Sequence, residues 1–180
     1  MVEKKRVKFH LILMRHAKSD WSRPGVADHE RPLNMRGRSD APAMARWLSE
    51  QDMIPDAILC SSAVRTVETG HLLNATWKLA VDLHTSDALY LASAEQLFEV
   101  ISSEGPAWAS QRPITKLMVL ARNPGISDAA SILSDGSVEL PTAGAVIFHC
   151  DIADWTTRLH SGKVQLVSQM RPKLLDRTIA

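Results

Sequence analysis

The sequence has few cysteines and few glycines, the residues on which disulfide-rich, zinc-binding and nucleotide-binding proteins depend. Its 180 residues include two cysteines, Cys60 and Cys150, and eight scattered glycines. Two distant cysteines make neither a disulfide framework nor a zinc site, and scattered glycines form no nucleotide-binding loop. No apolar run reaches the ~18 residues of a membrane-spanning helix, and the seven histidines lack metal-ligand spacing. We therefore expect no metal, no cofactor and no membrane partner.

The chain also lacks an excess of charge of one sign. It carries 21 Lys+Arg against 20 Asp+Glu, a formal net charge of +1. The distribution is uneven, because residues 1–46 hold eleven basic and five acidic side chains, or +6, whereas residues 47–180 hold ten and fifteen, or −5. The basic segment is not interleaved with aromatic residues, so we expect no nucleic-acid partner.

The remaining composition is that of an ordinary soluble globular protein, with 45% hydrophobic and 23% charged residues. No linker or repeat divides the chain, and its length suits one domain over residues 1–180. The basic run at residues 4–6 precedes an apolar stretch, but Lys8 and His10 interrupt that stretch and no cleavage site follows it, unlike in a signal peptide. Both cysteines lie in apolar runs and are expected to be buried free thiols, which favours a cytoplasmic location.

Apolar runs and helical periodicity alternate along most of the chain. Compact apolar runs predict strands at 7–14, 56–60, 79–83, 116–121, 145–150 and 164–170. Helical spacing and capping residues predict helices at 39–51, 63–73, 94–102 and from Asn123 to about 133, with Ser61-Ser62 and Asn123 as N-caps. The alternation predicts an α/β sandwich with a largely parallel sheet.

Basic residues follow three of the predicted strands directly. Arg15 and His16 follow the first, Arg65 opens the helix after the second, and Arg122 follows the strand at 116–121. Ligands of open α/β sheets bind beyond the carboxyl ends of the strands. Arginine forks and helix N-termini both favour phosphate. A neutral imidazole between arginines is a nucleophile suited to phosphorus, so His16 is a candidate for covalent catalysis.

Several segments resemble the histidine phosphatase superfamily in its short SixA-like branch. The first is LILMRHAKSDW, which carries the family's signature on Arg15, His16 and Ala17. Further segments are RPLNMRGRSDA (31–41), CSSAVRTVETG (60–70), ALYLAS (88–93), NPGISDAA (123–130), LPTAGAV (140–146) and MRPKLL (170–175). The resemblance covers about residues 7–175 and implies a three-layer α/β/α sandwich similar to phosphoglycerate mutase.

The resemblance also implies roles for individual residues. His16 would form a phosphohistidine that water then hydrolyses, and Arg15 and Arg65 would hold the phosphate oxygens. Asp87 takes the place of an acid that precedes a leucine-tyrosine segment in relatives, which makes it a candidate proton donor; alternatively it is a turn residue. Arg31 lies on the loop over the site and either touches substrate or fixes that loop.

One position departs from the family pattern. Relatives read Gly-His-Asn-Pro, whereas this chain reads Ala121-Arg122-Asn123-Pro124. Arginine binds phosphate but cannot carry protons, because its pKa is above ~12. Two alternatives follow. Either the protein is a working phosphatase with Arg122 as a further phosphate ligand, or it is a pseudophosphatase that binds phosphate or a phosphorylated partner without efficient turnover.

The segment between Leu73 and Ala94 is short and supplies no lid, so the pocket is expected to be open. An open pocket admits a phosphorylated side chain of another protein and favours a protein phosphohistidine over a small phosphoester. In the best-known members of the branch the partner is a histidine-containing phosphorelay domain, which implies a role in signal transduction. The predicted activity is therefore that of a phosphohistidine or phosphoester phosphatase.

Overall fold

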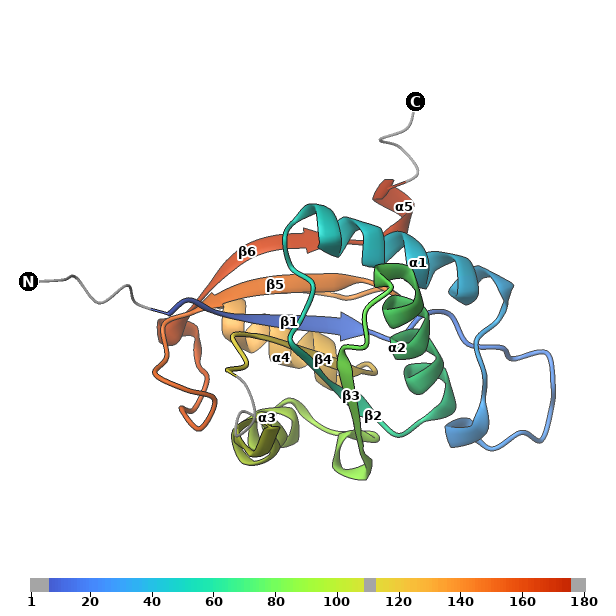
Figure 1. The fold of residues 1–180 in the computed structure, drawn as a ribbon. Helices are drawn as coiled ribbons and strands as arrows, with labels where there is room; N and C mark the ends of the chain where they lie inside the picture. Colours follow the sequence, from blue (N-terminus) through green and yellow to red (C-terminus); the bar gives the residue numbers. More distant parts are fainter. Residues whose placement is uncertain (1–6, 109–112, 176–180) are drawn as a thin grey trace, which may run out of the picture.

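The computed structural model describes residues 7–108 and 113–175, so the predicted basic lead-in at 4–6 lies outside the described part. Figure 1 shows the elements in chain order. The strands are β1 (Phe9–Arg15), β2 (Ala57–Ser61), β3 (Asp82–Ser86), β4 (Lys116–Ala121), β5 (Ala145–Cys150) and β6 (Val164–Met170). The helices are α1 (Met35–Glu50), α2 (Val64–Trp77), α3 (Ala94–Trp108), α4 (Gly125–Ser134) and α5 (Pro172–Leu175).

The six strands form one sheet in the order β3-β2-β4-β1-β5-β6. Strands β1 to β4 pair in parallel, β5 runs antiparallel to β1, and β6 runs antiparallel to β5. The prediction of a largely parallel sheet is confirmed, with β5 as the reversed strand. Because β1, β2 and β4 are parallel neighbours, their carboxyl ends meet at one edge of the sheet.

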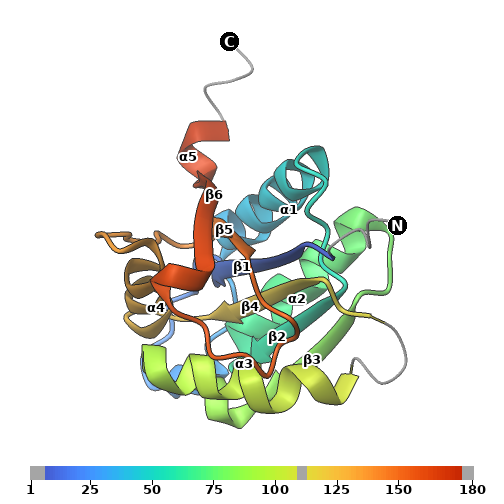
Figure 2. The same ribbon diagram turned by 90° about the vertical axis from the view of Figure 1, so that its left-hand side faces the viewer.

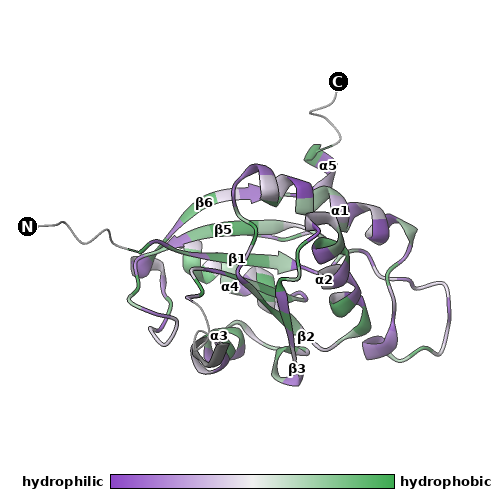
Figure 3. Ribbon diagram, in the orientation of Figure 1, coloured by the Kyte–Doolittle hydropathy of each residue, from purple (hydrophilic) through white to green (hydrophobic). Residues whose placement is uncertain are grey.

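Helices cover both faces of the sheet, as Figure 2 shows, so the predicted three-layer architecture is confirmed. The alternation of side chains along β1 separates two cores. Leu11 and Leu13 pack with the residues of α3 and α4, whereas Ile12 and Met14 pack with those of α1 and α2. All four are fully buried, and the central strands are largely green in the hydropathy view of Figure 3.

The third strand lies further along the chain than the apolar pattern indicates. Helix α2 extends to the buried Trp77, and Lys78 has a positive φ of 54° at its end, so the strand begins only at Asp82. β3 is an edge strand with mostly exposed residues. An edge strand needs no apolar run, which is why the apolar residues at 79–83 misplace it.

Two predicted N-caps are wrong. Ser61 ends β2, and Ala63 precedes α2 without a side-chain cap. Pro124, not Asn123, directly precedes α4. The Asn123 side chain instead donates to the carbonyl of Leu140 at 3.1 Å and accepts from the Ser127 hydroxyl at 2.7 Å. These contacts hold the segment after β4 against the segment before β5.

Both cysteines are buried free thiols, as predicted. Burial raises the pKa of Cys60 above its ordinary value and that of Cys150 to about 12. Among residues 7–108 and 113–175, no helix is long and apolar enough to cross a membrane.

Candidate active site

The carboxyl ends of β1, β2 and β4 open onto a small cleft with a volume of about 90 Å³. On this scale a cavity of about 10–15 Å³ holds one water molecule, so the cleft has room for an ion of a few heavy atoms. Four residues predicted from the strand ends come together here: Arg15, His16, Arg65 and Arg122. The full lining consists of Arg15, His16, Lys18, Ser19, Trp21, Asp28, Arg65, Arg122, Asn123 and Thr142.

His16 is held by the backbone on both sides of β1. Its N–H donates to the Ala121 carbonyl at 3.0 Å, and its carbonyl accepts from the Ala143 N–H at 3.0 Å. The ring Nδ1 lies 2.7 Å from the Ala17 carbonyl. A carbonyl can only accept a hydrogen bond, so Nδ1 carries the proton and Nε2 keeps a free lone pair. The side chain is thus prepared as a neutral nucleophile.

The surroundings of His16 keep the ring uncharged. Its exposed fraction is 6%. Burial is the main reason that the pKa of His16 falls from 6.5 to about 3, and the charges of the three cleft arginines add to this shift. The hydrogen bond to Ala17 acts in the opposite direction but is outweighed. His16 is therefore neutral throughout the physiological range.

This low pKa makes a prediction for stability at acid pH. Between about pH 6.5 and pH 3 the unfolded chain binds a proton at residue 16 that the folded protein does not, so this residue destabilises the fold as the pH falls. As the pH falls, the free energy of unfolding should decrease more steeply for the wild type than for His16→Asn. The two slopes should differ by at most about 1.4 kcal/mol per pH unit, the contribution of one titrating group. Urea unfolding at pH 7, 6, 5 and 4 measures both slopes, and parallel curves would contradict the prediction.

The loop after His16 is tied to α2 by residues of the CSSAVRTVETG segment. The Ala17 N–H donates to the Thr69 hydroxyl at 3.1 Å, and that hydroxyl donates to the Arg65 carbonyl at 2.7 Å. The Glu68 carboxylate accepts from the Leu33 N–H at 2.7 Å. These two side chains of α2 explain why the segment carries Glu and Thr after its arginine: they fix the loop over the site.

A close backbone approach holds the same loop against α1. Asn34 caps α1 by accepting from the Gly37 N–H at 2.9 Å, and its own N–H donates to the Lys18 carbonyl at 3.0 Å. A Cβ at Gly37 would lie 2.3 Å from that carbonyl oxygen. Only glycine fits here. This cap also explains why α1 begins at Met35, earlier than the apolar pattern predicts.

The three arginines contact the protein in different ways. Arg15 donates from Nη1 to the Leu140 carbonyl at 3.0 Å, and its buried Nε has no hydrogen-bond partner. Burial lowers the pKa of Arg15, as do the neighbouring charges of Arg122 and Arg65, while Glu139 opposes the shift. Arginine nevertheless stays protonated in proteins. The cleft therefore concentrates positive charge around His16.

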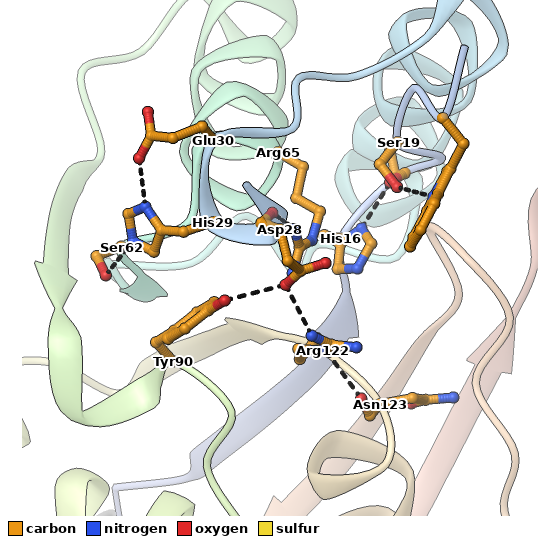
Figure 4. Close-up of polar contacts among 12 residues, drawn as sticks. His16, Ser19, Asp28, His29, Glu30, Ser62, Arg65, Tyr90, Arg122 and Asn123 are labelled. Carbon is orange, nitrogen blue, oxygen red and sulfur yellow. Dashed lines mark hydrogen bonds and ion pairs between the residues drawn. The ribbon is translucent and has the colours of Figure 1, made fainter. Parts of the chain in front are cut away.

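Arg65 and Arg122 converge on an acid that the sequence analysis did not identify, Asp28 (Figure 4). Its Oδ2 accepts from Nη2 of Arg65, from Nη1 of Arg122 and from the Tyr90 hydroxyl, each at 3.0 Å. Its backbone carbonyl also accepts from Nη1 of Arg65. Arg65 is 2% exposed, and Arg122 donates in addition from Nε to the Asn123 carbonyl at 3.1 Å.

Asp28 is ionised in this arrangement. Burial by itself would raise the pKa of its carboxyl, but the hydrogen bond and charge of Arg65, together with Tyr90 and Arg122, hold the pKa below its usual value. The residue lies in the 3-10 turn Asp28–Glu30 of the long loop after β1. The loop has no hydrophobic periodicity from which Asp28 could be predicted. The sequence offers one signal for Asp28, its position between two segments that the family resemblance covers.

The two remaining predicted residues do not line the cleft. Asp87 is exposed at the start of the 3-10 turn Asp87–Leu89, so the structure does not bring the candidate proton donor to His16. Arg31 lies with its guanidinium 4.1 Å from the centre of the Trp21 ring. Trp21 does line the cleft, and its indole N–H donates to the Ser19 hydroxyl at 3.0 Å. Arg31 therefore supports the rim of the cleft through Trp21.

The cleft has no arrangement suited to a metal ion. Among the residues that the structure describes, no group of three or more His, Cys, Asp and Glu side chains could hold one.

Comparisons with known proteins give a family and a fold to which this chain is similar. The family model for the histidine phosphatase superfamily (branch 1) matches residues 11–90, a range that includes Arg15, His16 and Arg65. The chain is 33% identical over 153 residues to an uncharacterized chloroplastic protein of Arabidopsis thaliana, and the match covers 81% of this chain and 68% of the relative.

Two solved structures have a similar fold. One is the protein histidine phosphatase SixA complexed with tungstate, with a TM-score of 0.71, 20% identity, and coverage of 93% of this chain and 99% of that one. The other is a mycobacterial glucosyl-3-phosphoglycerate phosphatase, with a TM-score of 0.59, 17% identity, and coverage of 88% and 97%.

Proposed function

The chain belongs to the histidine phosphatase superfamily, and on this premise we propose that it is a phosphatase that removes the phosphoryl group from phosphohistidine on another protein. The observation that carries the proposal is the neutral His16 ring, with Nδ1 bound to the Ala17 carbonyl and Nε2 free, at the base of a cleft that three arginines line.

In the first step the Nε2 lone pair of His16 attacks phosphorus. A bond from Nε2 to phosphorus forms, the bond from phosphorus to the leaving group breaks, and the leaving group keeps that electron pair. The guanidinium groups of Arg15, Arg65 and Arg122 stabilise the charge on the three phosphoryl oxygens. In the second step water attacks the phosphohistidine, inorganic phosphate is released, and Nε2 regains its lone pair.

The ionised state of Asp28 supports phosphohistidine as the substrate class. Asp28 is the one carboxyl among the described residues that line the cleft, and it has no proton to donate. An alkyl alcohol leaves as an alkoxide unless an acid protonates it. The ring nitrogen of phosphohistidine that is not bonded to phosphorus carries a proton near neutral pH, so the ring leaves as neutral imidazole. A site without a general acid therefore favours phosphohistidine and aryl phosphates.

The shape of the rim supports a protein partner. Trp21 lines the cleft while its side chain is 64% exposed, and Lys18 beside it is also exposed. A phosphorylated side chain can therefore enter from the surface, and a histidine-containing phosphorelay domain in a cytoplasmic signalling pathway is the partner we propose. The tungstate bound by the similar SixA structure is a tetrahedral oxyanion, as phosphate is.

A second candidate function rests on Arg122. Its Nη1 is engaged by Asp28 and its Nε by the Asn123 carbonyl, which leaves Nη2 and one Nη1 proton for a phosphoryl oxygen. If this guanidinium does not reach the transferring group, the protein binds a phosphorylated partner without efficient turnover. The loss of one preorganised donor costs on the order of 100- to 1000-fold in rate.

Substrate preference tests the proposal. The purified protein is assayed with a phosphohistidine-carrying phosphorelay domain, p-nitrophenyl phosphate and phosphoserine. We expect kcat/KM for the phosphorelay domain and for p-nitrophenyl phosphate to exceed that for phosphoserine by at least about 100-fold. Phosphoserine is an alkyl ester that needs a general acid, and a general acid contributes about this factor. Equal hydrolysis of phosphoserine would mean that an acid outside this cleft, such as Asp87, serves the reaction.

The variant Arg122→His separates the two candidate functions. An active wild type supports the phosphatase. An inactive wild type together with an active Arg122→His variant supports the binding protein instead. Arg36→His is the matched control, because Arg36 is an exposed residue of α1 that pairs with Asp40 and lies outside the cleft.

A further inference from the structure

We propose that Asp28 is an internal competitor for the phosphate site: its carboxylate holds Arg65 and Arg122 before a phosphoryl group binds, yields them to that group, and takes them back when inorganic phosphate leaves. The inference rests on the proposed function, since it assigns the same arginines to phosphate. It adds a role for a residue to which the family resemblance gives none.

The contacts of the carboxylate carry this inference. A single oxygen, Oδ2, accepts hydrogen bonds from Arg65, Arg122 and Tyr90, each at 3.0 Å (Figure 4). Two of these three donors are the guanidinium groups that a bound phosphoryl group needs. Phosphoryl oxygens and Oδ2 therefore compete for the same two guanidinium groups, because an N–H that Oδ2 holds is not available to phosphate.

The charges of the cleft give the competition its strength. Among the described lining residues Arg15, Lys18, Arg65 and Arg122 contribute +4 and Asp28 contributes −1, so these side chains together carry +3. Burial lowers the pKa of Arg15 most, and the charges of Arg122 and Arg65 lower it further, so the arginines repel one another. Asp28 relieves this repulsion. When a dianion is bound, the same carboxylate repels it at close range, in a region of reduced dielectric.

The attachment of Asp28 allows its side chain to move without the loop. Its backbone carbonyl is held by Arg65, and the neighbouring His29 is held by the Ser62 hydroxyl at 3.0 Å and packs edge-on against Tyr90. The carboxylate itself is 36% exposed, so water can solvate it when it leaves the arginines. A side-chain rotation thus exchanges the carboxylate for phosphate while the turn Asp28–Glu30 stays anchored.

The exchange has a consequence for turnover. Hydrolysis of the phosphohistidine leaves inorganic phosphate between three arginines and a lysine, where it would bind tightly and inhibit the enzyme. A carboxylate that is already attached beside the site returns to the arginines at a high effective concentration. Asp28 therefore limits the affinity for the product.

The test is to measure how tightly the isosteric variant Asp28→Asn binds tungstate and inorganic phosphate. Isothermal titration at constant ionic strength gives the dissociation constant, and inhibition of p-nitrophenyl phosphate hydrolysis gives the inhibition constant for phosphate. We expect both constants to decrease at least about tenfold in Asp28→Asn, because the variant removes the repelling charge and its uncharged amide competes weakly for the arginines.

Two further variants keep the test decisive. Asp20→Asn removes the same charge from the same loop, at a half-buried residue outside the cleft lining whose carboxylate accepts from the Ser22 N–H, and should change the constants less than about twofold. Tyr90→Phe removes one donor to Oδ2 and leaves the charge, so binding should tighten by about two- to tenfold. Tyr90→Phe also serves if Asp28→Asn fails to fold, which its thermal melting curve reveals.

The outcomes separate this inference from the proposed function. The wild type could be an active phosphatase while Asp28→Asn binds tungstate no more tightly than the wild type does. That result would overturn the competitor role and would mean that Asp28 only positions the arginines. If no variant binds tungstate, both the competitor and the proposed function fail. If Asp28→Asn binds tungstate tightly and the wild type binds it weakly, the competitor role of Asp28 is supported, whatever the substrate of the enzyme.

Discussion

Replacement of His16 by alanine is expected to reduce kcat/KM by on the order of 10⁴-fold or more, because in the proposed mechanism it removes the atom that receives the phosphoryl group. The arginines remain, so tungstate should bind to His16→Ala within a few-fold of the wild type. Rapid-quench experiments with ³²P-labelled substrate measure the second consequence. The wild type should form an acid-labile phosphoenzyme in a burst, and His16→Ala should form none.

A matched substitution controls for the loss of any histidine. His71 lies in α2, is exposed and does not line the cleft, so His71→Ala should retain wild-type kcat/KM. Activity above about 1% of the wild type in His16→Ala would mean that water attacks the substrate directly. The arginines alone would then carry the catalysis, as preorganised donors do in enzymes that lose a nucleophile.

The convergence of Arg15, His16, Arg65 and Arg122 could be predicted from the sequence for a physical reason. Each residue lies within a few positions of a strand end, and the strands are short apolar runs that are easily recognised. Parallel strands bring those ends to one edge of the sheet whatever the loops do. The fold class and the central strand β4 were predicted from the same pattern, and both are confirmed.

Asp28 could not be predicted in this way. It lies in an irregular loop of about twenty residues, whose path is set by long-range contacts such as the one between Glu68 and the Leu33 N–H. Sequence spacing carries no information about such contacts. Asp87 illustrates the same limit, because its place before a leucine-tyrosine pair gives no sign that the turn Asp87–Leu89 leaves it exposed.

Arg122 also needed the structure for its interpretation. From the sequence it is one extra positive charge at a position where the family resemblance implies histidine. In the structure Arg122 pairs with Asp28, which lies 94 residues earlier in the chain. An arginine at this position is therefore part of a pair. Substitutions at Arg122 and Asp28 should be interpreted together, because residues that share a hydrogen bond are not energetically independent.

Arg65→Lys is expected to have the second-largest effect, a decrease in kcat/KM of about 1000-fold. The guanidinium of Arg65 is 2% exposed and donates to both the carbonyl and the carboxylate of Asp28 from its two terminal nitrogens. A lysine keeps the charge but has one nitrogen and no planar fork. It therefore cannot hold the Asp28 carbonyl and a phosphoryl oxygen at once. Steady-state kinetics with p-nitrophenyl phosphate measures the loss, and we expect most of it in kcat.

Arg38→Lys is the matched control for this substitution. Arg38 also pairs with a carboxylate, that of Glu68 at 3.0 Å, but its side chain is 52% exposed and does not line the cleft. An exposed ion pair contributes little, so Arg38→Lys should stay within about threefold of the wild type. Similar losses in the two variants would show that positive charge alone is needed. A loss confined to Arg65→Lys means that the buried fork, with donors directed at both Asp28 and the phosphoryl group, is what the reaction requires.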